Sequence, residues 1–166
     1  FNAADFIDRK EARKMDLYTQ YAIVAAKEAI EDSAMDLDKV DKNKIGVIYG
    51  VGIGGLNTLE EELFNYALNK DTMGPKFNPF FIPKMIADIA SGHISIMYGF
   101  HGPNFTTTSA CASSSNAIAD AFNYIRLGKA NVIVAGGAEA AICPGGVGGF
   151  NAMHALSTRN DDPTRA

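Results

Sequence analysis

The chain has 166 residues, of which 47% are hydrophobic and 20% are charged, a balance typical of an ordinary globular domain. Its net charge of −4 provides no overall positive field that would attract nucleic acid or an anionic membrane. No apolar run approaches the roughly 18 residues of a membrane-spanning helix, and the N-terminus lacks a signal-peptide pattern. The two cysteines do not make a disulfide framework, so we expect a cytoplasmic protein with free thiols.

The first half of the chain predicts helices around one strand. Residues 15–35 form an amphipathic helix, and 44–50 read as a short buried strand ending in glycine. Residues 57–70 predict a second helix with Asn57 as its N-cap. The apolar face of the first helix is assigned to Leu17, Tyr21, Val24, Ala25 and Ala29.

The second half predicts two more strands. Residues 71–85 contain three prolines and predict an irregular loop, and Pro83 suits the first turn of a helix reaching about Tyr98. A strand-like 104–110 then leads into a helix over 113–128 with Gly128 as its C-cap. The last two elements are an apolar, buried strand of the parallel-sheet kind at 131–137 and a short helix at 149–157.

The alternation of strands and helices predicts an α/β fold with a largely parallel sheet. The chain opens on the approach to a helix and stops without a closing element. We therefore expect it to be a piece of a larger protein.

The glycine-rich stretch from Gly50 to Gly55, GVGIGG, satisfies the G-x-G-x-x-G pattern of dinucleotide-binding loops. That pattern also needs an acidic residue about 20 positions later, at the end of a second strand. Asp71 lies near that position but follows a helix, and the Lys-Ser/Thr pair of a phosphate-binding loop is missing. The favoured interpretation is close backbone packing, with nucleotide binding as the weaker alternative.

Cys111 lies where a β-branched polar run meets a helical pattern, in TTTSACASSSNAIADAF. Ile118, Ala121, Phe122 and Ile125 recur at helical spacing behind it. A helix N-terminus favours the thiolate, and its free N–H groups can stabilise an oxyanion when a thioester is attacked. A catalytic nucleophile and an inert buried cysteine both remain open on these local features.

The second cysteine and the histidines receive no catalytic role. Cys143 lacks the setting of Cys111 and is interpreted as structural. A cysteine nucleophile usually has a histidine partner, but none of the three histidines has a catalytic context. His93 is interpreted as a packing or capping residue, His101 as a turn residue and His154 as part of a helix face.

Several motifs, in order along the whole chain, resemble the elongating β-ketoacyl-acyl-carrier-protein synthases, most closely the synthase II group. They are RKEARKMD, GVGIGG, NPFFIPKMIADIASGHISIMYGFHGPN, TTTSACASSSNAIADAF, VIVAGGAEA and GGVGGFNAMHALSTRNDDPTRA. The resemblance implies a thiolase-like fold, layered αβαβα in the complete protein, of which residues 1–166 supply most of the N-terminal half. A first strand would precede Phe1, and the C-terminal half would follow Ala166.

The resemblance also implies an activity. Cys111 would take an acyl group from acyl-carrier protein, and decarboxylative condensation with malonyl-carrier protein would lengthen the chain by two carbons. The backbone N–H of Cys111 would be one oxyanion donor. Two histidines, a lysine and a glycine-rich loop with a phenylalanine, which complete the family's site, would lie after Ala166, so the isolated chain would be inactive. No cofactor and no metal is implied.

Other site residues follow from the same resemblance. Ile53 would gate the acyl pocket, Phe150 would form another wall, and Phe81 with Ile82 would reach into the partner's pocket across a homodimer. A basic patch that docks acyl-carrier protein would comprise Lys10, Arg13, Lys14 and Lys76. Without the resemblance, the charges of RKEARK would be interpreted as a solvated face.

His154 stands where several relatives carry arginine, which weakens a docking role there. Two other functions stay open. A degradative thiolase shares the fold and a cysteine, although NPFFIP and ALSTRND argue against it. A chain-length-factor-like subunit would have lost its nucleophile, and Cys111 argues against that reading.

Overall fold

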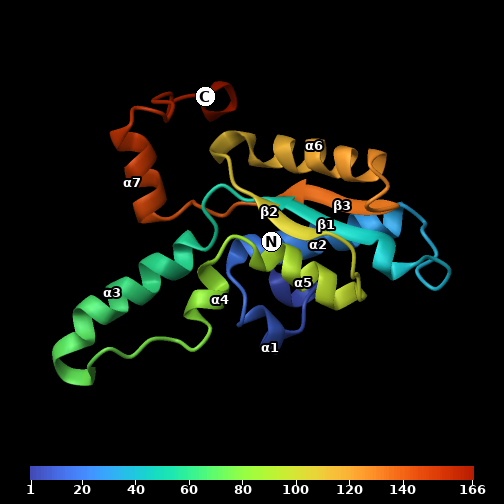
Figure 1. Ribbon diagram of the computed structural model, residues 1–166. Helices are drawn as coiled ribbons and strands as arrows, with labels where there is room; N and C mark the ends of the chain where they lie inside the picture. The colour runs from blue at the N-terminus through green and yellow to red at the C-terminus, as the bar shows by residue number, and fades with distance from the viewer.

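The computed structural model describes all residues from 1 to 166 and contains a three-stranded parallel sheet. The strands are β1 (Ile45–Gly50), β2 (Asn104–Thr107) and β3 (Val132–Gly137), and β1 lies between the other two in the order β2-β1-β3 (Figure 1). Both pairings are parallel, which confirms the α/β prediction. The carboxyl ends of all three strands therefore meet at one edge of the sheet.

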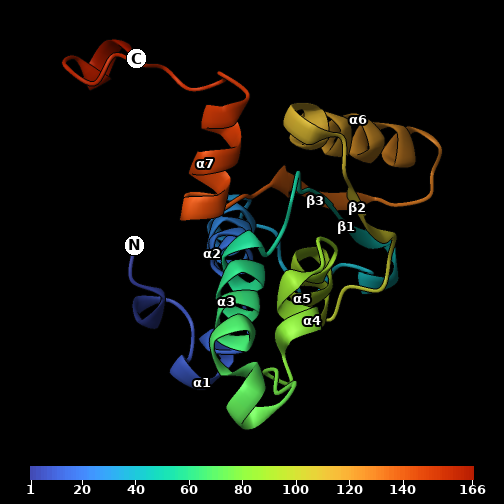
Figure 2. The ribbon, with the colours of Figure 1, turned by 90° about the vertical axis from the view of Figure 1, so that its left-hand side faces the viewer.

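Helices cover both faces of this sheet. Helices α2 (Leu17–Asp32) and α5 (Ile89–Tyr98) pack on one face, and α6 (Ser113–Arg126) lies along the other (Figures 1 and 2). The main core joins α2, β1 and α5, whereas a smaller cluster places Ala117 and Ala121 of α6 against Ile48 of β1. The result is three layers with the sheet in the middle.

Four further helices lie around the layers. The long α3 (Leu56–Met73) extends away from the sheet, as Figure 1 shows. The others are α1 (Arg9–Ala12), α4 (Phe81–Met85) and α7 (Pro144–Ala152). Single 3-10 turns are η1 (Ala3–Asp5), η2 (Lys42–Lys44), η3 (Ala110–Ala112) and η4 (Pro163–Arg165). None of the helices combines the length and apolar character needed to cross a bilayer.

The predicted helix at 15–35 is confirmed as α2, although it starts two residues later and ends three residues earlier, and its predicted apolar face is mostly wrong. Val24 of that face is buried, whereas Ala25 and Ala29 are exposed. The buried set is Tyr18, Thr19, Ala22, Ile23, Val24, Ala26 and Ile30. The helix is rich in alanine on both sides, so apolar character alone does not reveal which side meets the sheet.

The region from residue 55 to 98 also differs from the prediction. Gly55, and not Asn57, is the N-cap of α3, and the Asn57 side chain instead donates a hydrogen bond to the Ala140 carbonyl. The stretch 71–85 is not wholly irregular, because α3 continues to Met73 and α4 occupies its end. Pro83 lies within α4, which is separate from α5.

The C-terminal third is closer to expectation. The predicted helix at 113–128 is α6, and Gly128 follows its end with a φ of 67°, as a C-cap glycine should. Strand β3 is parallel as predicted, but it is an edge strand and only partly buried. The last helix, α7, starts and ends earlier than the predicted 149–157.

Candidate active site

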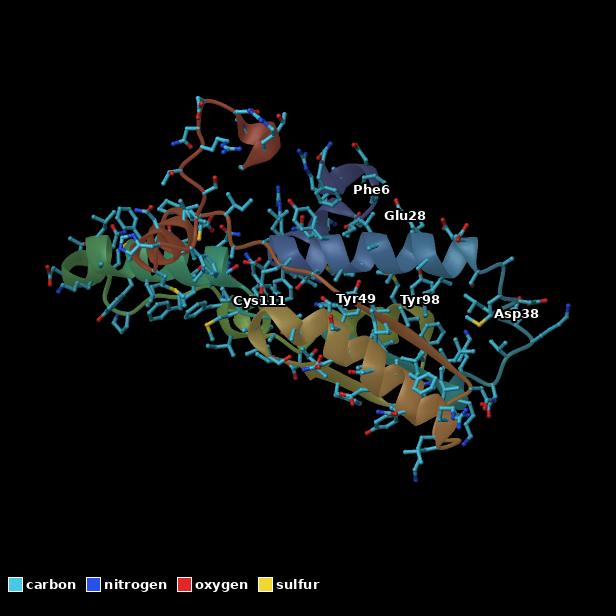
Figure 3. All side chains as sticks on the ribbon, turned by 90° about the horizontal axis from the view of Figure 1, so that it is seen from above. Phe6, Glu28, Asp38, Tyr49, Tyr98 and Cys111 are labelled. Carbon is cyan, nitrogen blue, oxygen red and sulfur yellow. The ribbon has the colours of Figure 1, made fainter.

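Cys111 lies in the η3 turn, directly between the end of β2 and the start of α6. The prediction of a strand-to-helix junction is therefore confirmed. Its side chain is exposed, which removes the alternative of an inert buried cysteine. Figure 3 shows Cys111 at the N-terminal end of α6, and the parallel register places it at the carboxyl edge of the sheet.

A network around one buried serine fixes this turn. Ser113 is only 4% exposed, and its hydroxyl donates to the Ala110 carbonyl at 2.7 Å and accepts from the Ser109 N–H at 2.9 Å. The Thr107 hydroxyl donates to the Ser113 carbonyl at 2.9 Å. Ala110 has a φ of 51°, a left-handed conformation that costs a non-glycine residue free energy and persists only where neighbours hold it.

Two glycines allow α6 to approach the strand ends closely. A Cβ atom at Gly50 would lie 2.4 Å from the backbone of Ser113 and Ser114. One at Gly137 would meet the Ser114 hydroxyl and, at 2.7 Å, the Gly50 carbonyl. The last residues of β1 and β3 therefore form a bare backbone platform on which the first turn of α6 rests.

The N-terminus of α6 has no side-chain cap. The first N–H groups of a helix lack partners within the helix, and together they carry a partial positive charge. These N–H groups can hold the oxyanion formed when the Cys111 sulfur attacks a thioester carbonyl. The local geometry suits a nucleophile for acyl transfer.

Cys143 was predicted to lack such a setting, and that prediction is wrong. Cys143 is the N-cap residue of α7, a helix whose start the sequence pattern placed later. Its surroundings nevertheless differ from those of Cys111, because its side chain is buried. The Gly145 N–H in the first turn of α7 donates to the Glu60 carboxylate at 2.6 Å. The Glu60 carboxylate therefore already occupies an N–H group at this helix end, so that group is not free to bind a substrate oxygen.

A cavity of about 510 Å³ lies beside Cys111. Ile53 and Phe150, predicted as acyl-pocket residues, line it together with the thiol. Both side chains are partly exposed, at 46% and 39%, so neither is a core residue. The structure thus brings three of the predicted site residues together from the β1–α3 loop, η3 and α7.

The glycine-rich loop meets a carboxylate that sequence reasoning missed. The Ile53 N–H donates to Glu139 Oε2 at 2.7 Å, and the Gly54 N–H donates to Glu139 Oε1 at 3.0 Å. A dinucleotide loop would present such N–H groups to phosphate. Here a protein carboxylate occupies them, which argues against nucleotide binding. Glu139 follows β3 within VIVAGGAEA, where the pattern predicted only a strand.

Phe81 and Ile82 lie in α4 and do not line the cavity beside Cys111. Phe81 is half-buried and stacks on Phe77 with ring centroids 5.5 Å apart, and Phe77 also contacts Tyr66. Ile82 is 54% exposed. Within one chain, Ile82 is therefore the freer of the two to contact another subunit.

The four predicted docking cations converge on one hollow of about 630 Å³. Lys10, Arg13 and Lys14 come from α1 and the turn after it, and Lys76 joins them from the α3–α4 loop. Lys14 also forms a salt bridge to Glu11 at 2.7 Å. The family resemblance implied this grouping, although 62 positions separate Lys14 from Lys76.

None of the three histidines lines the cavity beside Cys111. His93 lies half-buried in α5, and burial lowers its pKa, which agrees with a neutral packing residue. His154 was predicted on a helix face, but it follows the end of α7 with a φ of 55°. No general base for Cys111 is assigned from this chain.

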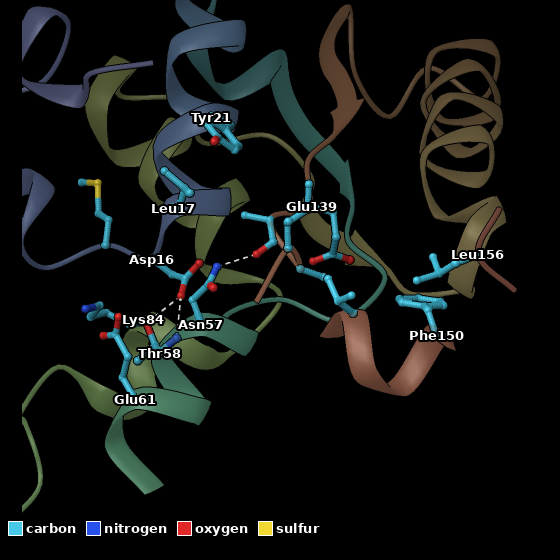
Figure 4. Close-up of a pocket in the computed structure, with 15 residues that line it drawn as sticks. Asp16, Leu17, Tyr21, Asn57, Thr58, Glu61, Lys84, Glu139, Phe150 and Leu156 are labelled. Atoms are coloured by element: carbon cyan, nitrogen blue, oxygen red, sulfur yellow. Dashed lines mark hydrogen bonds between the residues drawn. The ribbon is translucent and has the colours of Figure 1, made fainter. Parts of the chain in front are cut away.

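A second cavity of about 660 Å³ lies next to the first and is shown in Figure 4. Asp16 stands on its wall, where its carboxylate accepts hydrogen bonds from the Thr58 N–H at 3.0 Å and hydroxyl at 2.6 Å. This buried contact ties the start of α2 to the start of α3. Glu139 and Phe150 line both cavities, so they form part of the wall between them.

Comparison with known proteins agrees with this geometry. Residues 2–166 match the family model described as the β-ketoacyl synthase N-terminal domain. The chain is 45% identical over 99% of its length to a 3-oxoacyl-[acyl-carrier-protein] synthase 2 of Staphylococcus aureus, and 46% identical over its whole length to one of Synechocystis. It spans 40% and 39% of these two relatives.

Solved structures show the same fold. A β-ketoacyl synthase from Burkholderia phymatum superposes with a TM-score of 0.81 and 30% identity, covering 98% of this chain and 39% of that one. A ketosynthase complex of a type II polyketide system, which holds its acyl-carrier protein and a hexaketide, gives a TM-score of 0.85 and 26% identity, covering 95% of this chain and 44% of that one. The fold is thiolase-like, as predicted, and the chain belongs to the β-ketoacyl synthase family.

Proposed function

We propose that the chain is part of a condensing enzyme of fatty acid elongation, a 3-oxoacyl-acyl-carrier-protein synthase of type 2. The Cys111 thiolate attacks the thioester carbonyl of an acyl-carrier protein, and the carrier's thiolate leaves. Malonyl-carrier protein then loses carbon dioxide, and the resulting carbanion attacks the acyl-Cys111 thioester. The Cys111 thiolate is released, and the product is a β-ketoacyl-carrier protein two carbons longer.

The observation that carries this proposal is the exposed Cys111 at the uncapped N-terminus of α6, beside a cavity with apolar walls. Acyl transfer needs a nucleophile, an oxyanion site and room for the acyl group. Ile53 and Phe150 provide apolar surface for the acyl tail. The 45% identity to synthase 2 proteins selects this function among the chemistries that the fold supports.

The proposed partner is acyl-carrier protein. The hollow lined by Lys10, Arg13, Lys14 and Lys76 presents four cations and one carboxylate, that of Glu62. Such a surface suits an acidic protein, because complementary charge speeds association and fixes orientation. The related polyketide ketosynthase has been solved with its own acyl-carrier protein, which supports this assignment.

We further propose a homodimer in which Phe81 and Ile82 approach the partner's pocket. The high exposure of Ile82 supports its part, whereas the stack on Phe77 limits how far Phe81 can move. The two free cysteines fit a reducing compartment such as the cytoplasm.

The condensing activity is assigned to a larger protein. The outer side of α6 exposes Ile118, Phe122 and Ile125 at 58%, 62% and 43%, an apolar stripe that suits contact with further protein. Residues 1–166 alone should not decarboxylate malonyl-carrier protein, because the groups of a catalytic site act as a unit and the remaining groups would lie in that further protein. Turnover by the isolated chain at the rate of a complete synthase would contradict this assignment.

A non-catalytic, chain-length-factor-like subunit and a degradative thiolase are the alternatives. The first lacks a nucleophile, and the second would accept acyl groups from a carrier other than acyl-carrier protein. The deciding experiment incubates the full-length protein with acyl-carrier protein bearing a labelled acyl group and maps the adduct by mass spectrometry. Acylation of Cys111 that Cys111→Ala abolishes and Cys143→Ala preserves is expected. No adduct at Cys111 would overturn the proposal.

A further inference from the structure

Glu139 lies beside Cys111, and its carboxylate accepts hydrogen bonds only from backbone N–H groups. Its two oxygens accept from Ile53 at 2.7 Å and from Gly54 at 3.0 Å. None of the four salt bridges in the chain involves Glu139. The side chain therefore acts on the loop between β1 and α3, and not on another charged group.

The loop is shaped to receive this carboxylate. A Cβ atom at Gly52 would lie 2.9 Å from Glu139 Oε2 and 3.5 Å from the Ala110 carbonyl oxygen. Gly54 has a φ of 94°, which side chains rarely tolerate. Gly52 thus lies close to both Glu139 and the turn that carries Cys111, and its lack of a side chain makes this close fit possible.

The position of the loop decides where Ile53 stands. Ile53, Glu139 and Cys111 line the same cavity of about 510 Å³. Glycines flank Ile53 on both sides, so the neighbouring backbone has wide conformational freedom. The paired N–H···carboxylate bonds restrict that freedom at the two residues concerned. Figure 4 shows Glu139 between the β3 end and the region of Phe150.

We propose that Glu139 is a positioning residue that holds the Ile53 loop against the cavity and thereby sets the discrimination between short and long acyl groups. This inference rests on the proposed function, in which Cys111 carries the acyl group and Ile53 borders its tail. With the carboxylate in place, Ile53 has a fixed location. Without it, the loop samples other positions and the cavity loses its defined length.

Two variants remove the contact from opposite sides in the full-length protein. Glu139→Gln keeps the size of the side chain but replaces one acceptor by an NH₂ group, and Gly52→Ala drives a methyl group into the carboxylate. Asp41→Asn is the matched control. Asp41 is an exposed carboxylate that also accepts a backbone hydrogen bond, from the Asn43 N–H at 3.0 Å, but it does not line the cavity.

The measurement is kcat/KM for acyl-carrier proteins with primers of increasing length, together with hydrogen–deuterium exchange of the loop peptide. Each variant should change the ratio of short-primer to long-primer kcat/KM by about tenfold, the effect of losing a hydrogen bond to a charged group. The loop peptide should exchange faster, and the Asp41→Asn control should match wild type. The double variant should be no worse than either single one, because both remove one contact.

The outcomes separate the two proposals. Faster exchange with an unchanged primer ratio would reduce Glu139 to a structural contact and overturn the positioning role. Unchanged exchange and an unchanged ratio would overturn it as well. If Cys111 takes no acyl group in wild type, the proposed function fails, and the positioning role fails with it whatever the exchange shows.

Discussion

The platform beneath Cys111 can be tested by adding one methyl group at Gly50. The Cβ atom of Gly50→Ala would lie 2.4 Å from the backbone of Ser113 and Ser114, against an ordinary contact of 3.4–4 Å. The clashing atoms are backbone, so no side chain can rotate away. The start of α6, with the Cys111 turn, must therefore shift by about 1 Å, and overpacking of this kind costs roughly 1–3 kcal/mol of stability.

A shift of this size should affect acyl transfer more than simple thiol reactivity. Misplacement by about 1 Å can reduce a rate by roughly 100-fold when a reaction depends on the alignment of several groups. Alkylation by iodoacetamide needs mainly the thiolate, which remains at the helix N-terminus. We expect acylation of Cys111 by acyl-carrier protein to fall by about 100-fold, and alkylation to fall by less than about tenfold.

The assay compares both rates, and urea unfolding measures stability, in wild type, Gly50→Ala and a control. Gly92→Ala is the matched control, because its added Cβ would meet no atom within 4 Å apart from the neighbouring backbone of its own helix, α5. That change should be neutral or stabilise by about 0.5–1 kcal/mol. Equal acylation rates in Gly50→Ala and wild type would refute the reasoning that this glycine sets the position of the nucleophile.

Three other outcomes are expected. Limiting iodoacetamide should label Cys111 before Cys143, which is buried at a helix end that Glu60 already occupies; preferential labelling of Cys143 would contradict this. Reversing Lys10 and Arg13 to Glu should raise the KM for acyl-carrier protein in a salt-dependent way, and an unchanged KM at low salt would make the cluster a solvated face. Ile53→Phe should lower kcat/KM more for long primers than for acetyl-length ones by overpacking, and equal losses at every length would make Ile53 a packing residue.

The sequence predicted the order of the main elements and the place of Cys111 because these depend on local patterns. Alternating periodicity, a glycine after a helix and a β-branched run before one are visible within a few residues. The elements between residues 71 and 85 were predicted less well. Proline is compatible with the first turn of a helix, so three prolines did not exclude the short α4.

Which side of a helix packs on the sheet was harder to predict than the position of the helix itself. In α6 the small residues Ala117 and Ala121 face the sheet, whereas the larger Ile118 and Phe122 point away from it. Close approach of a helix to the strand ends favours small side chains at the contact, and apolar periodicity cannot distinguish a tight contact from a wide one. The same ambiguity misassigned the face of α2, where alanines lie on both sides.

The glycine-rich loop shows why the chemistry of a site is less visible than its location. Successive backbone N–H groups in such a turn bind an anion, and the loop sequence cannot tell a phosphate from a carboxylate. The deciding group is Glu139, which lies 86 positions after Ile53 and reaches the loop only because β3 pairs with β1 in parallel register. Gly50 pairs with Gly137 at the end of that register, and Glu139 follows two residues later. The parallel sheet therefore brings Glu139 to a loop that resembles a nucleotide motif, and the Glu139 carboxylate holds this loop beside the nucleophile.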